Sequence, residues 1–228
     1  MPSDRRLQVV VFDLDDTIYP EAQYVRSGYA AVARFLRERL GRAERFEEYL
    51  WDRFQAGTSR NALDTLNEQF HLGLDKAGID ELVTVYRNHR PTIAAFPGMV
   101  DLLELLRGRY RLAMLSDGFL PAQEYKIHAL AIEPFFEYVL LTEKLGRDFW
   151  KPSPVPFRKL SEDMGVQADA CLYVADNPTK DFLAPNQLGW RTLQALQPGQ
   201  IHADLPAPPG GRPQCVVKSL DELAAALR

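Results

Sequence analysis

The sequence predicts an α/β fold in which a largely parallel sheet is accompanied by an inserted all-helical segment. Short apolar runs recur along the chain, and between the later runs the apolar residues repeat at helical spacing, which is typical of βαβ units. The stretch from about residue 22 to residue 90, by contrast, contains no convincing strand. With 228 residues, 46% of them hydrophobic, the chain is long enough to bury such a core.

Six apolar runs are interpreted as strands because they are short and rich in residues that favour β-structure. Right-handed crossovers between parallel strands would bring the carboxyl ends of these strands to one edge of the sheet. The six runs are Leu7–Phe12, Arg111–Leu115, Tyr138–Leu141, Cys171–Ala175, Trp190–Leu193 and Cys215–Val217.

The segment between the first two strands is expected to be helical, since apolar residues from Val25 to Leu40 are spaced by three or four. Glycines interrupt the pattern and indicate roughly four helices, packed as a cap that could open and close. We therefore expect an α/β core of residues 1–19 and 92–228 and a helical cap of residues 20–91. The interrupting glycines are Gly41, Gly57, Gly73 and Gly78.

Charge and composition exclude several classes of partner. Lys and Arg total 27 against 31 Asp and Glu, a net charge of -4, which gives no electrostatic reason to bind nucleic acid or an anionic membrane. The two cysteines do not form a disulfide framework, and the apolar run near the N-terminus is too short for a signal peptide or membrane span. We expect a cytoplasmic protein, and the sequence carries no signal for its oligomeric state.

Polar residues follow four of the expected strands, where open α/β sheets gather their ligands. Four strand ends could therefore converge on one pocket. The first strand is followed by Asp13, Asp15, Asp16 and Thr17, the second by Ser116, Asp117 and Gly118, and later segments supply Lys151, Asp176 and Asp181.

Carboxylates brought together in this way repel one another unless a cation lies between them, and an all-oxygen site with few ligands suits Mg²⁺. Asp13, Asp176 and a backbone carbonyl near Asp15 form a plausible set of ligands. Lys151 and the Ser116 hydroxyl would then bind phosphoryl oxygens. Asp13 would attack phosphorus, and Asp15 would protonate the leaving alcohol and later deprotonate a water molecule.

Two Pro-containing pairs are expected to begin helices that point at this pocket. Ser153-Pro154 and Asn177-Pro178 each have an N-cap residue followed by proline in the first helical position. Helix N-termini favour anions, so they would add partial positive charge to the pocket.

The order of these residues resembles the four signature motifs of the haloacid-dehalogenase superfamily, from Val9 to about Leu193. Its Asp-x-Asp-x-Thr pattern matches Asp13, Asp15 and Thr17, and the later motifs match Ser116, Lys151, Asp176 and Asp181. The resemblance is to the subfamily with a Rossmann-like core and a helical cap between the first and second motifs. It implies that Asp13 is the nucleophile and a metal ligand, and that Asp15 is the acid/base and provides its carbonyl to the metal. It also implies that Asp176 and Asp181 form or support the Mg²⁺ site. The residues that would hold the substrate are Lys151, Thr17, Ser116, Asp117 and Gly118.

Two features depart from the family pattern. Ala175 stands where members usually have glycine, and the loop from Gly146 to Lys151 is about two residues longer than usual. Neither change removes a reactive group, but the longer loop alters how Lys151 is presented and places Trp150 where it could line the pocket.

The leading hypothesis is a Mg²⁺-dependent phosphatase acting on a small phosphorylated metabolite such as a sugar phosphate, phosphoglycolate or a nucleotide. A sugar-phosphate mutase would use the same aspartyl phosphate, and a non-catalytic phospho-ligand sensor would bind without turnover. A phosphorylated-aspartate receiver domain fits poorly, because the acidic run follows the first strand. In the expected cap, exposed polar residues are usually only solvated, but a few could contact the leaving group. They are Arg60, His71, Tyr86, His89 and Arg90.

Overall fold

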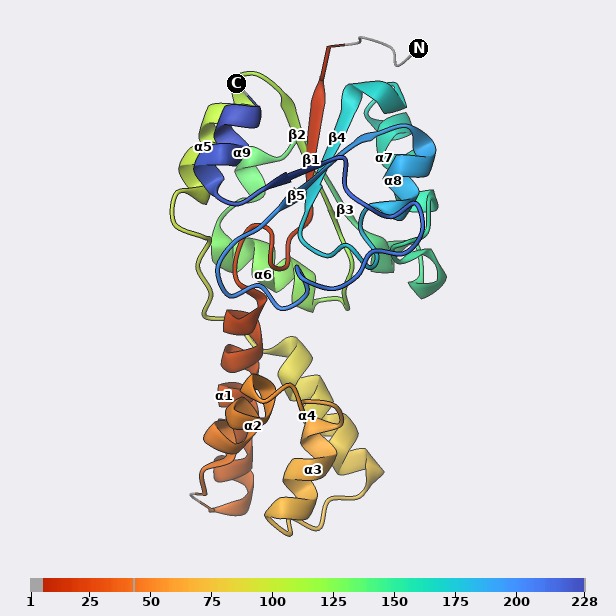
Figure 1. Cartoon of the computed structure of the whole chain (residues 1–228). Helices are drawn as coiled ribbons and strands as arrows, with labels where there is room; N and C mark the ends of the chain where they lie inside the picture. The colour runs from red at the N-terminus through yellow and green to blue at the C-terminus, as the bar shows by residue number, and fades with distance from the viewer. Residues whose placement is uncertain (1–5, 43, 228) are drawn as a thin grey trace. The chain divides into compact units, whose positions relative to one another are not determined.

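The computed structural model describes residues 6–42 and 44–227, which form two compact units (Figure 1). The sheet unit comprises the described residues of Met1–Ala22, Ala94–Phe119 and Leu130–Arg228, and the helical unit those of Gln23–Ile93 and Leu120–Ala129. The helical unit thus includes a second segment that the sequence-based division assigns to the core. No helix in the described ranges combines the length and apolar character needed to cross a membrane.

The sheet unit contains six parallel strands in the order β3-β2-β1-β4-β5-β6. This order confirms the predicted α/β class, and all six apolar runs contain strands. Because the chain moves outward in one direction from β1 to β3 and in the other from β4 to β6, the order reverses between β1 and β4, where open sheets bind ligands. The strands are β1 Val9–Phe12, β2 Arg111–Ser116, β3 Tyr138–Leu141, β4 Cys171–Ala175, β5 Arg191–Ala195 and β6 Cys215–Val217.

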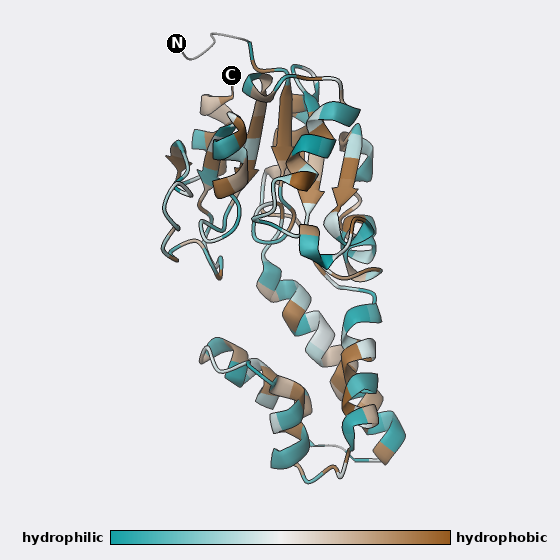
Figure 2. Ribbon diagram, turned by 90° about the vertical axis from the view of Figure 1, so that its right-hand side faces the viewer, coloured by the Kyte–Doolittle hydropathy of each residue, from teal (hydrophilic) through white to brown (hydrophobic). Residues whose placement is uncertain are grey.

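Helices cover both faces of this sheet, with α5 and α9 on one side and α7 and α8 on the other (Figure 1). The central strands are buried on both faces, so they are continuously apolar and appear as brown arrows in Figure 2. Phe157 and Trp190 pack against one face together with Tyr173 of β4. The four helices are α5 Met99–Arg107, α7 Val155–Asp163, α8 Leu183–Leu188 and α9 Leu220–Ala226.

Short helical turns complete the connections between strands. They are η1 Glu133–Phe135, η2 Thr142–Lys144, η3 Arg147–Phe149 and η4 Ala168–Ala170, and α6 spans Ala122–Leu130. At the N-terminus of the last helix, the Ser219 hydroxyl accepts a hydrogen bond from Glu222 N at 3.1 Å.

The helical unit contains four helices between β1 and α5, as the sequence predicts. Gly41, Gly57 and Gly73 lie between helices and adopt positive φ. The prediction for Gly78 is wrong: it lies inside a helix, where its amide donates to the carboxylate of the N-cap residue Asp75 at 2.9 Å. The cap bond offsets the low helix propensity of glycine. The helices are α1 Glu21–Leu40, α2 Phe46–Gln55, α3 Ala62–Gln69 and α4 Lys76–Asn88.

The expected helix start at Asn177 is wrong. The Asn177 side chain accepts from Thr179 N at 3.0 Å and forms a turn, and the next helix begins only at Leu183. The Asp181 carboxylate accepts from Asn177 N at 3.0 Å, so this turn closes on itself before a helix can start. At the other proline pair, α7 begins at Val155. The N-cap position is therefore occupied by Pro154 and not by the predicted Ser153.

Candidate active site

Asp13 lies at the carboxyl end of β1, where its backbone is still part of the sheet. Asp13 N donates to Val174 O of β4 at 2.9 Å. Because β1 and β4 are neighbouring parallel strands, the residue after β4, Asp176, emerges at the same edge. Asp13 is only 3% exposed and Asp176 only 2%. The fold therefore buries two carboxylates at the point where the strand order reverses.

A third carboxylate, that of Asp181, completes a compact cluster. One oxygen each of Asp13, Asp176 and Asp181 lies within 4.8 Å of the others. Burial, followed by the charges of Asp181 and Asp13, raises the pKa of Asp176 to about 9. Burial also raises the pKa of Asp13 to about 6, against the opposing effect of Lys151. Both shifts show that the cluster has more negative charge than its protein surroundings stabilise.

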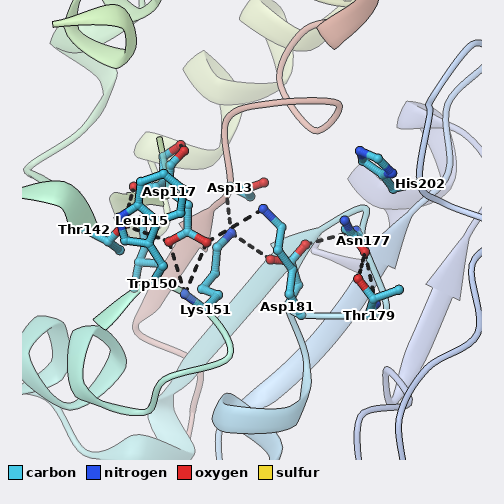
Figure 3. Close-up of polar contacts among 12 residues, drawn as sticks. Asp13, Leu115, Asp117, Thr142, Trp150, Lys151, Asn177, Thr179, Asp181 and His202 are labelled. Carbon is cyan, nitrogen blue, oxygen red and sulfur yellow. Dashed lines mark hydrogen bonds and ion pairs between the residues drawn. The ribbon is translucent and has the colours of Figure 1, made fainter. Parts of the chain in front are cut away.

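Lys151 places a buried ammonium group beside two of these carboxylates, those of Asp13 and Asp181 (Figure 3). Its Nζ lies 2.8 Å from Asp13 Oδ1 and 2.7 Å from Asp181 Oδ1. Burial alone would lower the pKa of Lys151, but the charges of Asp13 and Asp181 hold it well above its ordinary value. Lys151 is therefore a permanent cation at the end of β1, and the longer preceding loop does not prevent it from reaching Asp13.

The three carboxylates fit a divalent cation. Their donors are all hard oxygen atoms, as Mg²⁺ prefers. Asp176 Oδ2 is buried and has no hydrogen-bond partner among the residues that the structure describes. An ion there would satisfy that oxygen and offset the repulsion that raises the pKa values of Asp13 and Asp176. Asp13, Asp176 and Asp181 are the residues that would hold it.

Asp15 points to a different neighbour. The Tyr19 hydroxyl donates to Asp15 Oδ1, and Tyr19 is fully buried. Within the described residues, the three-carboxylate cluster does not include the Asp15 side chain. The Asp15 side chain thus lies outside the cluster, and its roles in proton transfer and, through its carbonyl, as a metal ligand stay predictions.

Ser116 is the last residue of β2, Asp117 follows it, and Asp117 contacts the Lys151 loop. Both residues are buried. The Asp117 carboxylate accepts from Thr142 Oγ1 at 2.8 Å and from Lys151 N at 3.2 Å. Asp117 therefore holds the backbone that presents Lys151, a role that no local sequence signal predicts. Gly118 adopts a φ of 144°, a value that favours glycine.

Thr17 is also buried next to the acidic run, and its Oγ1 has no partner in the described part of the chain. Trp150 donates from Nε1 to Glu143 at 3.1 Å, and its ring packs edge-to-face on Phe119. The Thr17 hydroxyl is thus available to bind a substrate oxygen. The contacts of Trp150 hold the part of the loop that precedes Lys151.

Two further residues touch the predicted ones. Tyr173 of β4 is fully buried, and its hydroxyl accepts from Lys151 Nζ at 2.8 Å and donates to Leu115 O at 3.3 Å. Lys180 places its Nζ 3.7 Å from Asp117. Tyr173 lies in an apolar run and so resembles a core residue, while the only signal for Lys180 is its position beside Asp181.

Asp16 ties the catalytic loop to a distant segment. Its φ is 53°, and its carboxylate accepts from Glu21 N and from Ile201 N, both at 2.7 Å. Asp16 O also accepts from the Gln200 side chain at 2.7 Å. The loop after β5 is therefore bonded directly to the loop that carries Asp13 and Asp15.

Comparisons with known proteins agree with this geometry. A family model described as haloacid dehalogenase-like hydrolase matches residues 7–189. A glyceraldehyde 3-phosphate phosphatase of Methanopyrus kandleri is 25% identical over 82% of this chain and 83% of its own. The mouse N-acylneuraminate-9-phosphatase is 24% identical over 98% and 94%. The structure of a putative HAD-hydrolase of Bacillus subtilis bound to magnesium is similar with a TM-score of 0.68, at 22% identity over 98% and 100% of the two chains. Because the family model matches most of its length, this chain belongs to the haloacid dehalogenase-like hydrolase family.

Proposed function

We propose that the protein is a Mg²⁺-dependent phosphatase that hydrolyses a small phosphorylated metabolite through an aspartyl-phosphate intermediate. The observation that supports this best is the buried group of Asp13, Asp176 and Asp181, with the Lys151 ammonium beside Asp13 and Asp181. The names of the two curated relatives, both phosphatases, support the same reaction class.

In the first step, an oxygen of Asp13 attacks phosphorus, and the bond between phosphorus and the ester oxygen breaks. Asp15 gives its proton to the departing oxygen, so the leaving group is released as an alcohol. Lys151, already 2.8 Å from Asp13, stabilises the phosphoryl oxygens as their charge increases. The bound ion would supply positive charge between the Asp13 carboxylate and the phosphate.

In the second step, water attacks the phosphorus of the Asp13 phosphate. Asp15, now a carboxylate, takes a proton from that water, and the bond between phosphorus and Asp13 breaks to release inorganic phosphate. The hydrogen bond from Tyr19 keeps the Asp15 carboxyl group in one orientation between the two steps. Both carboxylates return to their starting protonation states.

The proposal is tested by turnover of p-nitrophenyl phosphate with and without Mg²⁺. Asp13→Asn should reduce kcat by at least about 10³-fold, because it removes the nucleophile, and EDTA should suppress the wild-type reaction. Asp101→Asn, in the first turn of α5 and exposed, is the matched control and should leave kcat unchanged. Equal activity of Asp13→Asn and wild type would rule the mechanism out.

A phosphometabolite panel then separates this proposal from the two alternatives. A phosphatase releases inorganic phosphate from at least one member without forming an isomer. A sugar-phosphate mutase would return isomerised sugar phosphate, and a sensor would bind members of the panel without consuming them.

A further inference from the structure

The loop that follows β5 is bonded to the backbone beside two of the predicted metal ligands, Asp15 and Asp176. Residues 196–205, the β5 loop, lie in the sheet unit together with both ligands. Two glutamine side chains, Gln194 of β5 and Gln200 of the loop itself, make the connections. Among the described residues, the β5 loop supplies no carboxylate to the three-carboxylate cluster, so its effect on a metal ion acts through these bonds.

Gln194 connects the β5 loop to the backbone of Asp176. Its Nε2 donates to Asp176 O at 2.8 Å and to Ala203 O at 2.9 Å, and the residue is buried. Both partners are carbonyl oxygens, which only accept, so the orientation of the amide group is determined. Parallel pairing places Gln194 opposite Ala175, the residue before Asp176. The bond therefore fixes the backbone from which the Asp176 carboxylate extends.

Gln200 makes the same kind of connection to the loop after β1. Its Nε2 donates to Asp16 O and to Ala195 O, both at 2.7 Å, and its Oε1 accepts from Gln197 N at 2.8 Å. The side chain thus uses both donors and its acceptor on backbone groups. Gln200 therefore joins the backbone of Asp16 to the end of β5.

Asp16 is the residue through which the β5 loop acts on Asp15. Its φ of 53° is uncommon for a residue with a side chain and persists only where surrounding bonds hold it. Those bonds are present, since the Asp16 carboxylate accepts from Ile201 N and Glu21 N, and its carbonyl from Gln200. Because φ describes the rotation between Asp16 and the preceding peptide group, holding it fixes the direction of the Asp15 carbonyl.

We propose that Gln194 and Gln200 are positioning residues for the metal site, which they preorganise from the β5 loop before an ion binds. This role rests on the proposed function, because the ion is the Mg²⁺ of that reaction. Mg²⁺ demands near-ideal octahedral geometry, so ligands that are already held in place bind it more tightly than ligands that must first be ordered. Residues that orient metal ligands typically contribute about 10–100-fold to metal affinity or activity.

Calorimetric titration of the full-length protein with MgCl₂ tests this role without turnover. Gln200→Met and Gln194→Met keep the length of the side chain but remove its donors, so each should raise the Mg²⁺ Kd at least about tenfold. Asn186→Leu is the matched control. The Asn186 amide also donates to two loop carbonyls, those of Gly210 and Arg212, but it joins them to α8 and not to a ligand loop. This variant should bind Mg²⁺ as the wild type does, even where its Tm falls.

Kinetics separate positioning from a loss of folded protein. In turnover of p-nitrophenyl phosphate by Gln200→Met, the Mg²⁺ concentration that gives half the maximal rate should rise by the same factor as Kd. KM for p-nitrophenyl phosphate at saturating Mg²⁺ should stay at the wild-type value. A loss of folded protein would instead lower the apparent kcat and leave both concentrations unchanged.

A Kd within about twofold of the wild-type value in a glutamine variant with the wild-type far-UV circular dichroism spectrum would overturn this inference alone. An equal rise of Kd in Asn186→Leu would also overturn it, because the effect would then follow from stability. Gln194→Met and Gln200→Met break different connections, so either one carries the test if the other does not fold. A wild type that binds no Mg²⁺ would overturn the proposed function as well, whereas absent turnover with the expected Kd values would overturn only the phosphatase reaction.

Discussion

At the scale of single residues, the site depends on buried charges that hold one another in place. Lys151 Nζ has three oxygen neighbours, two of them carboxylates and the third the Tyr173 hydroxyl. Removing either partner of a buried charged pair lowers the free energy of unfolding by more than the intact pair contributes to it, because the remaining charge has no water to solvate it. The residues around Lys151 should therefore respond strongly to substitution.

Tyr173→Phe removes the one neutral acceptor of Lys151 and should lower the free energy of unfolding by about 1–2 kcal/mol. It should also lower kcat several-fold, because Lys151 then has more freedom to move. Tyr138→Phe serves as the control, because it removes a hydroxyl that donates a solvent-exposed hydrogen bond to Asp163. It should change the free energy of unfolding by less than about 0.5 kcal/mol. Urea unfolding and steady-state kinetics measure both effects. Equal stability of the two variants would contradict the positioning role of Tyr173.

Asp176→Asn should have opposite effects with and without metal. In EDTA at pH 7.5 the variant should be more stable than wild type by about 1 kcal/mol or more, because each unit of raised pKa corresponds to about 1.4 kcal/mol and Asp176 carries a large upward shift. Saturating Mg²⁺ at a hundred times Kd should stabilise wild type by about 2.7 kcal/mol and the variant far less. Thermal unfolding checks both; a variant that gains as much from Mg²⁺ as wild type would exclude Asp176 from the metal site.

The structure brings Asp13, Asp176 and Lys151 together, as the sequence predicts, while their roles stay predictions. Asp13 and Asp176 directly follow neighbouring parallel strands, and Lys151 lies in the longer loop after β3. Tyr173 and Asp16 escape prediction for a physical reason. Tyr173 has the pattern of a core residue, since only its hydroxyl reaches Lys151. The Asp16 carboxylate bonds to Ile201, and no local pattern predicts a contact across so much of the chain.

At the scale of elements, close contact between α1 and α4 shapes the helical unit. Gly28 of α1 allows Tyr86 of α4 to approach, and Tyr86 packs against Tyr24 and Tyr29 of α1 at 5.6 and 5.8 Å between ring centroids. The same contact positions His89. The aromatic residues of both helices thus hold α1 and α4 against each other.

Gly28→Ala tests this contact. Alanine favours helix over glycine by about 1 kcal/mol, yet its Cβ would lie 2.4 Å from Tyr86 Cε2. Overpacking should dominate and lower the stability of the helical unit by about 1–3 kcal/mol. Gly108→Ala, whose Cβ would lie 3.5 Å from the nearest backbone oxygen, should be nearly neutral. Amide hydrogen exchange in α1 and α4 reports the result, and faster exchange only in Gly108→Ala would contradict it.

The pH dependence of this unit should follow His89. Burial, opposed by the Tyr86 carbonyl and reinforced by Lys126 and Arg34, lowers its pKa below 6.5. Between that folded-state pKa and about 6.5, the unfolded chain binds a proton that the folded chain does not, so stability rises with pH through this window. The stability advantage of wild type over His89→Gln should therefore be larger at pH 7.5 than at pH 5.5. Urea unfolding at both pH values would contradict this if the difference were constant or reversed.

Prediction of elements succeeds where periodicity is strong and fails where a side chain overrides it. All six strands and the four helices of the insertion follow from apolar spacing. Gly78 and Asn177 are exceptions because carboxylates intervene. Asp75 accepts a hydrogen bond from Gly78 N and caps the helix, so the chain is helical where Gly78 was expected to interrupt it. Asp181 accepts from Asn177 N and stabilises a turn where a helix was expected to start.

At the scale of the whole molecule, a protein with a net charge of -4 must attract anions through local groups. In the sheet unit Lys151 lies beside a carboxylate cluster, and in the helical unit three arginines line a pocket. The family follows from the order of motifs along the chain, which the match to the hydrolase model confirms. The sequence does not distinguish the arginines that line the pocket of the helical unit, because arginines on an amphipathic helix have the same pattern whether they bind a ligand or only water.

The central claim is that a phosphoryl group is transferred to Asp13. Asp15→Asn should still accept phosphoryl from p-nitrophenyl phosphate, whose leaving group needs little protonation, but should hydrolyse the intermediate slowly because no base activates water. Acid quenching of this variant with Mg²⁺, followed by proteolysis and mass spectrometry, measures the transfer directly. The account predicts a burst of nitrophenol with close to one phosphoryl group per chain on the peptide that contains Asp13. Nitrophenol release without protein-bound phosphoryl, or a phosphoryl group on Ser116, would contradict it.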